Sequence, residues 1–202
     1  MDGSCNRIYI AGEIGEAPVM SHACRGEEFV RLTLRVRRLS GVYDELPLIL
    51  PARAVPAEAA AGGALWARGQ VRAYTYAVEG RARLSLAVFS REAGLCPPAH
   101  ENAAELCGYV CKAPVLRCTP RGRVLTDLFI ACNRPFGRAD YLPVIVWGAN
   151  ARQSAALAVG DFVRVSGRLQ SRVYQKQMPD GSLTERTVCE ISGAAERLSG
   201  PI

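Results

Sequence analysis

The feature that most constrains this chain of 202 residues is an internal repeat. When the sequence is laid over itself so that Asn6 meets Asn102, the segments 6–52 and 102–148 match without a gap. Glycine, proline and acidic residues recur at the same places, including Gly12 with Gly108, Asp44 with Asp140, and Leu46-Pro47 with Leu142-Pro143. Chance rarely repeats residues of these types at one fixed spacing, so the chain consists of two copies of one domain.

The repeat also predicts the domain boundaries. We expect copy one at residues 1–94, a linker at 95–101 and copy two at 102–197. Beyond the first half of each copy the spacing grows by two residues, so that Gly69 aligns with Gly167. Such small length changes are tolerated in loops and at helix ends. Pro97 and Pro98 make the linker short and fairly stiff.

Each copy has the same pattern of predicted elements. Alternating apolar and polar residues favour strands at 8–14, 30–37 and 65–76 in copy one, and at 106–110, 125–132 and 162–174 in copy two. An alanine-rich helix is predicted at 149–159, ending at Gly160, and a turn joins the last two strands at 179–182. Five strands with one helix between the third and fourth are typical of the oligonucleotide/oligosaccharide-binding (OB) barrel. The expected fold is all-β, with two tandem OB-fold barrels.

A predicted hairpin at 133–148 carries aromatic rings on one face. A polar loop containing Gly137 and Asp140 is expected before its second strand. Tyr141 and Trp147 share parity on that strand, so both rings point to one side. Leu142, Val144 and Val146 point to the other side as core. Rings outside and aliphatic residues inside indicate a flat partner such as a nucleobase.

The charge pattern suits a polyanionic partner. The formal net charge is +6, and of the 25 cationic residues all except Lys112 and Lys176 are arginine. The predicted fourth strand of copy two alternates core residues with a polar row that includes Arg164, Arg168 and Arg172 and ends in Tyr174. Cations can hold a phosphate backbone while rings stack on bases. The alternative to nucleic-acid contact is that each ring packs as an ordinary structural residue and that each arginine is an ordinary solvated surface residue.

Other functional classes receive little support. We find no arrangement of nucleophile, base and orienting group and no phosphate-cradling glycine loop, so we expect no enzymatic activity and no cofactor. The eight cysteines come without a signal peptide, which predicts a cytosolic protein with reduced thiols. The set Cys107, Cys111 and Cys118 is the one cluster to weigh as a zinc site, but its spacing is not a standard zinc pattern.

Copy two resembles the bacterial single-stranded-DNA-binding protein family from Asn102 to about Gly193. The resemblance is carried by Gly108, the turn at 116–122, and the segments 131–136, 140–148 and 165–174. It implies that bases stack on Phe136, Tyr141, Trp147 and Tyr174. It further implies sequence-nonspecific binding and protection of single-stranded DNA in replication, recombination or repair. The implied assembly is a homodimer with four barrels, in the cytoplasm at the nucleoid.

Copy one aligns with copy two but differs in chemistry. Ser40, Glu45 and Pro51 stand where copy two has Phe136, Tyr141 and Trp147, and only Tyr76 matches a ring, Tyr174. We therefore expect copy one to bind the strand weakly through phosphates or to serve mainly in dimer contacts. The full set of candidate nucleic-acid contacts is Phe136, Tyr141, Trp147, Tyr174, Arg121, Arg134, Arg164, Arg168, Arg172 and Lys176 in copy two, with Arg35, Arg37 and Tyr76 in copy one.

Two expectations concern partners. The family commonly ends in a flexible tail with an acidic tip, whereas the last residues here are 196–202 without such a tip, so recruitment of replication enzymes through a tail is not expected. The alternative function is a protein-interaction or assembly module that resembles primosomal protein N. Alanine substitutions at the four rings would abolish strand binding under the first function and leave partner binding intact under the second.

Overall fold

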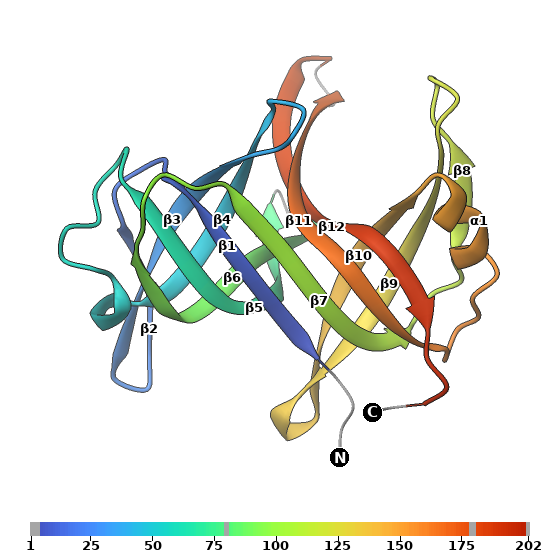
Figure 1. The fold of residues 1–202 in the computed structure, drawn as a ribbon, viewed down its shortest axis with the longest axis horizontal. Helices are drawn as coiled ribbons and strands as arrows, with labels where there is room; N and C mark the ends of the chain where they lie inside the picture. Colours follow the sequence, from blue (N-terminus) through green and yellow to red (C-terminus); the bar gives the residue numbers. More distant parts are fainter. Residues whose placement is uncertain (1–4, 79–80, 178–180, 201–202) are drawn as a thin grey trace.

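The computed structural model describes residues 5–78, 81–177 and 181–200. It contains twelve strands in one continuous sheet that rolls up at both ends into a barrel (Figure 1). Copy one holds β1 (Asn6–Ile14), β2 (Val19–Cys24), β3 (Glu27–Arg37), β4 (Tyr43–Pro51), the short 3-10 helix η1 (Ala52–Ala54), β5 (Ala64–Val78) and β6 (Arg81–Leu95). Copy two holds β7 (Glu101–Val110), β8 (Val115–Cys118), β9 (Val124–Arg134), the 3-10 turn η2 (Pro135–Gly137), β10 (Arg138–Trp147), α1 (Ala149–Ser154), β11 (Phe162–Gln177) and β12 (Leu183–Arg197).

The two copies are related by a pseudo-twofold axis that passes between β1 and β7. The strand order β2-β3-β4-β6-β5-β1-β7-β11-β12-β10-β9-β8 reads the same outward from this centre in both directions. β1 and β7 pair antiparallel, with Asn6 opposite Leu106 and Ile10 opposite Asn102. This pairing joins the barrels through backbone hydrogen bonds, and the two tandem OB-fold barrels expected from the sequence are confirmed.

Each barrel closes where its first strand meets its third, at a glycine that both copies share. β1 pairs with β3, and β7 pairs with β9. A Cβ added to Gly12 would lie 2.6 Å from the carbonyl oxygen of Arg35, and one added to Gly108 would lie 2.5 Å from that of Ala131. Only glycine allows the two backbones to approach this closely, which explains why both copies keep it.

The core of each barrel is aliphatic and comes from alternating strand positions. In copy one Leu32, Leu34 and Val36 of β3 are buried, and Leu128 and Ile130 of β9 are their counterparts in copy two. Burial of one face fixes the strand register, because a slip by one residue would expose the whole set. The alternate positions of the same strands face outward and are free to carry functional side chains.

The predicted elements differ from the observed ones in three respects. Each copy has six strands, because the short and wholly exposed β2 and β8 precede the second long strand. Copy one has no α-helix among its described residues, and its 3-10 helix is followed closely by Pro56, which cannot donate to a helical carbonyl. In copy two α1 ends at Ser154 and not at residue 159. The amides of Ala156 and Leu157 donate to carbonyl oxygens three residues back, as in a 3-10 turn, and the Ala158 amide donates to the Asp161 side chain.

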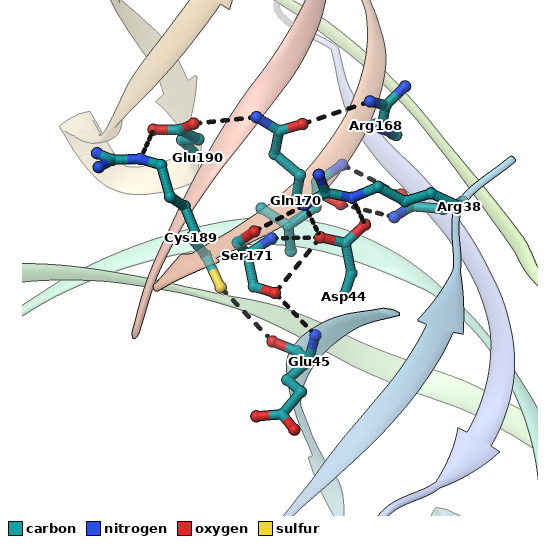
Figure 2. A network of polar contacts seen from close by, with 11 residues as sticks. Arg38, Asp44, Glu45, Arg168, Gln170, Ser171, Cys189 and Glu190 are labelled. Atoms are coloured by element: carbon teal, nitrogen blue, oxygen red, sulfur yellow. Dashed lines mark hydrogen bonds and ion pairs between the residues drawn. The ribbon is translucent and has the colours of Figure 1, made fainter. Parts of the chain in front are cut away.

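The barrels are clamped together by two buried acidic residues that occupy equivalent positions. The Asp44 carboxylate is 1% exposed and accepts hydrogen bonds from Arg38 of its own copy and from the Ser171 backbone amide, at 2.6 Å, in the other copy (Figure 2). The Asp140 carboxylate accepts from Arg72, at 2.6 Å, and from the Ala73 amide, at 3.1 Å. The prediction that Asp140 lies in a polar loop is therefore wrong, because it belongs to β10 and faces the other copy.

The cysteines correct a further expectation. Cys5 and Cys107 form a disulfide that links the start of β1 to β7 across the junction, so these two thiols are not reduced. Cys107 is therefore not available to share a metal with Cys111 and Cys118. Within residues 5–78, 81–177 and 181–200, no group of three or more metal-ligating side chains is arranged around a common point.

Candidate nucleic-acid interface

A basic groove lies on copy two, and we call it the copy-two groove. Its volume is about 590 Å³, and it runs along β11 between the end of β10 and the turn before β9. The end of β10 brings in an aromatic ring, while β11 and the turn bring in guanidinium groups. The residues that line the groove are Arg38, Arg123, Val124, Trp147, Gly148, Arg168, Gln170, Ser171, Arg172, Glu190 and Ser192.

Trp147 and Tyr141 stand outward on β10, as the period of two predicts. Trp147 is 37% exposed and Tyr141 is 51% exposed, whereas Leu142 and Val144 between them are buried. The two residues are six positions apart, so their rings lie roughly 20 Å apart along the strand. Trp147 lies in the copy-two groove, and Tyr141 lies beyond it, beside the buried Asp140.

Arginine side chains stand along the groove at spacings set by β11. Arg168 and Arg172 share parity on this strand and both line the groove. Arg123 reaches the same surface from the turn before β9, in which Thr119 accepts a hydrogen bond from the Arg123 amide. Fixed positive charges on adjacent elements form a surface that can neutralise successive phosphates of a polyanion.

A buried polar network supports the floor of the groove (Figure 2). Gln170 donates to Glu190 at 3.0 Å, and Glu190 lies 3.7 Å from Arg172. Arg38 of copy one donates to the Ser171 carbonyl oxygen at 2.7 Å. The hydrogen bond to Asp44 raises the pKa of Arg38 above its ordinary value, and burial opposes this effect. The network positions the arginines of β11 and ties the groove to the barrel junction.

Tyr174 continues the groove toward the tip of the β11–β12 hairpin. The Arg172 guanidinium lies 5.6 Å from the centre of the Tyr174 ring. Tyr174 also lines a second hollow, which lies between the hairpins of the two copies and is lined by Tyr76 of copy one as well. The ring that copy one retains therefore lies near its counterpart in copy two.

Phe136 is placed at a loop tip and not in the groove. Its side chain is fully exposed, and its backbone has φ 65°, in the left-handed region that side chains other than glycine rarely adopt. A fully exposed phenylalanine held in an unusual backbone conformation is uncommon for a purely structural residue. Phe136 stays a predicted base-stacking residue at the edge of the interface.

Several predicted contacts lie away from the copy-two groove. Arg134 is 3.4 Å from the buried Asp140, and Arg164 is 3.4 Å from Glu105 on β7. Arg121 is exposed on the turn before β9. The side chain of Lys176 lies outside the described residues. Of the predicted cations in copy two, the structure brings Arg168 and Arg172 together with Trp147.

Copy one presents its predicted arginines beside rings that sequence reasoning missed. Arg35 lies 4.8 Å from the centre of the Tyr43 ring and 3.5 Å from Glu13. The Tyr43 ring meets His100 edge to face, and the Arg37 amide donates to His100 Nδ1 at 3.2 Å. The linker histidine is thus folded against copy one, a contact that its position in the sequence gave no reason to expect.

The equivalent surface of copy one lacks the chemistry of the copy-two groove. Glu27 stands where copy two has Arg123, Pro51 where it has Trp147, and Gln70 where it has Arg168. Glu27 is also paired with Arg53 at 2.6 Å and with Arg91 at 3.2 Å. Contrasting Arg123 with Glu27 was the signal that could have identified Arg123 from the sequence.

Two free thiols, Cys132 on β9 and Cys189 on β12, have strongly raised pKa values. Burial raises the pKa of the Cys132 thiol and of the Cys189 thiol to about 12, and nearby acidic residues add to both shifts. Both therefore stay protonated at neutral pH. No helix in the described part of the chain is long and apolar enough to cross a membrane.

Comparison with known proteins places copy two in a defined family. The single-strand binding protein family model matches residues 101–195. The chain is 36% identical over 97 residues to the single-stranded DNA-binding protein of Clostridium tetani, covering 45% of this chain and 64% of that protein. It is 34% identical over 97 residues to single-stranded DNA-binding protein 2 of Clostridium acetobutylicum, covering 45% of this chain and 70% of that protein.

The whole chain also has a structural counterpart. The wild-type single-stranded DNA binding protein from Thermus aquaticus superposes with a TM-score of 0.78 at 21% identity, covering 98% of this chain and 96% of that one. At this identity the likeness concerns the fold, and it extends over both copies. The chain spans about two thirds of the length of the clostridial relatives, and the matched part of it is copy two.

Proposed function

Because the chain belongs to the single-strand binding protein family, we propose that it binds and protects single-stranded DNA without sequence preference in replication, recombination or repair. The observation that carries this proposal is the copy-two groove, where one exposed indole stands beside a row of guanidinium groups. A ring stacks on any base, and arginines contact any phosphate, so this combination suits a sequence-tolerant binder.

The proposal assigns a role to each part of the groove. Trp147 stacks on a base, and Arg123 and Arg168 contact phosphates on either side of it. Tyr174 and the more peripheral Tyr141 and Phe136 stack on further bases. Each stacked base contributes about 1–3 kcal/mol. The alternative, a protein-interaction module, gains no specific support from the described surface. We propose no enzymatic activity for the chain.

The experiment that tests the function is binding of oligo-dT by the purified chain and by a Trp147→Ala variant. We expect the wild-type chain to bind in a salt-dependent manner and the variant to bind at least tenfold more weakly. Val19→Ala serves as the control, because Val19 is an exposed apolar residue on β2 of copy one and does not line the copy-two groove. Equal affinities for the wild-type chain and the Trp147 variant would count against the proposal.

We further propose that two chains associate, giving four barrels, and that the protein acts in the cytoplasm at the nucleoid. The outer face of the central strands supports the association. There the Tyr9 and Trp66 rings of copy one stack with centres 6.3 Å apart, at positions where copy two has Glu105 and Arg164. Sedimentation equilibrium of the purified chain tests it, and a mass of one chain at all concentrations would refute it.

A further inference from the structure

A second cleft lies between the β5–β6 hairpin of copy one and the β11–β12 hairpin of copy two. Its volume is about 370 Å³. Tyr76 faces Arg83 across the first hairpin, and Tyr174 faces Arg186 across the second. Each copy therefore contributes one tyrosine and one arginine to what we call the inter-hairpin cleft. Its lining is completed by Leu84, Ser85, Thr187, Val188 and Cys189.

The two arginines have unused hydrogen-bond donors. The Nε atoms of Arg83 and Arg186 are inaccessible to solvent and have no hydrogen-bond partner among the described residues. No aspartate or glutamate is among the described residues that line the cleft, while Ser85 and Thr187 add hydroxyl groups. Both side chains are partly exposed, so an anion can reach the guanidinium groups although the Nε atoms themselves are covered, and arginine binds phosphate oxygens with particular geometric fit.

The inter-hairpin cleft continues the copy-two groove. Arg172 lines the groove, and its guanidinium lies over the Tyr174 ring, which lines the cleft. A strand that passes Trp147 and stacks on Tyr174 is thereby led to the gap between the hairpins. A backbone phosphate is the anion that such a strand would bring with it.

The composition of copy one supports the same assignment. Copy one lacks a ring at three of the four stacking positions of copy two, and the ring it retains, Tyr76, is the one that lines the cleft. We propose that the inter-hairpin cleft binds one phosphate of single-stranded nucleic acid between Arg83 and Arg186, with Tyr76 and Tyr174 beside it. Copy one thus contributes half of a composite site. This inference rests on the proposed function of copy two.

The test compares Arg83→Gln and Arg186→Gln with Arg31→Gln, a control at an exposed position on β3 of copy one. Binding of oligo-dT of increasing length is measured at several salt concentrations. We expect each cleft variant to bind long oligomers about tenfold more weakly. The salt slope, which is the slope of the logarithm of the binding constant against the logarithm of the salt concentration, should be smaller in magnitude by about 0.7, the value for one lost phosphate contact on a single strand. The control should match the wild-type chain. Thermal unfolding checks the fold, and because the two Nε atoms are unpaired in the free protein we expect no loss of stability.

The outcomes separate this inference from the function on which it rests. If the wild-type chain binds oligo-dT but both cleft variants bind within twofold of it with unchanged salt slopes, the cleft assignment is wrong and the groove assignment stands. A change in oligomeric state without a change in affinity would also overturn the assignment. Arg83→Lys adds a second measure, since it should keep the salt slope but lose affinity with the guanidinium geometry.

Discussion

Removal of the Asp44 carboxylate should destabilise the junction between the two barrels. In the folded chain this carboxylate accepts hydrogen bonds from Arg38 Nε at 2.9 Å, from Arg38 Nη2 at 2.5 Å and from the Ser171 amide at 2.6 Å. Asp44→Ala leaves a guanidinium and a backbone amide without this acceptor. Breaking a buried ion pair from one side costs about 3–5 kcal/mol. Because the Arg38 side chain is 24% exposed and water can reach part of it, we expect Asp44→Ala to lower the free energy of unfolding by about 3 kcal/mol, the lower end of this range.

The assay is equilibrium unfolding in urea, followed by circular dichroism. Asp127→Ala is the matched control, because Asp127 pairs with Arg117 on the surface, where the side chains are 39% and 47% exposed. A surface pair contributes less than about 1 kcal/mol. The reasoning would be refuted if Asp44→Ala lowered the free energy of unfolding no more than Asp127→Ala does. Asp140→Ala should behave like Asp44→Ala, since the two carboxylates hold equivalent positions.

Three further predictions concern the cysteines and the glycine at the barrel closure. Alkylation at pH 8 followed by mass spectrometry should modify the exposed Cys24 and Cys118 long before Cys132 and Cys189. A pKa of about 12 leaves roughly one in ten thousand of the Cys132 and Cys189 thiols ionised at that pH. Equal alkylation rates for the four thiols would contradict the assigned burial. Reduction of the Cys5–Cys107 bond should lower the free energy of unfolding by up to about 4 kcal/mol, because the bond closes a span of 102 residues. The stability of Cys5→Ser should not change with reductant. The same intact mass with and without reductant would show that the bond does not form. Gly108→Ala should lower the stability of copy two by about 2 kcal/mol or more, because the new methyl group would clash with the Ala131 carbonyl oxygen. Gly122→Ala has open space around the new methyl group, so it should lower stability only through backbone strain. Equal losses of stability would argue against the close approach of the strands at Gly108.

Much of the fold could be predicted because the chain carries it twice. The repeat placed glycines, prolines and acidic residues in register, and alternation identified the long strands whose inner faces are buried. β2 and β8 gave no such signal, since every residue in them is exposed. The predicted helix in copy one had no local support strong enough to overcome Pro56 and the Gly62-Gly63 pair.

The candidate site was predictable in part. The outward direction of Tyr141 and Trp147 follows from the period of two, and the structure agrees. What no periodicity could supply is which residues meet across the junction. Asp140 looked like a loop residue but contacts copy one, and Arg83 and Arg186 become neighbours only when the hairpins of the two barrels are placed together. Contacts of this kind depend on the pairing of β1 with β7, which neither copy alone encodes.

The central claim is that the copy-two groove stacks bases and holds phosphates, and fluorescence of Trp147 tests it most directly. In a Trp66→Phe background Trp147 is the one remaining tryptophan of the two in the chain. Titration with oligo-dT at two salt concentrations should quench this fluorescence, and the affinity should fall as salt rises. A folded protein whose Trp147 emission stays unchanged, with no salt-dependent binding, would contradict the account.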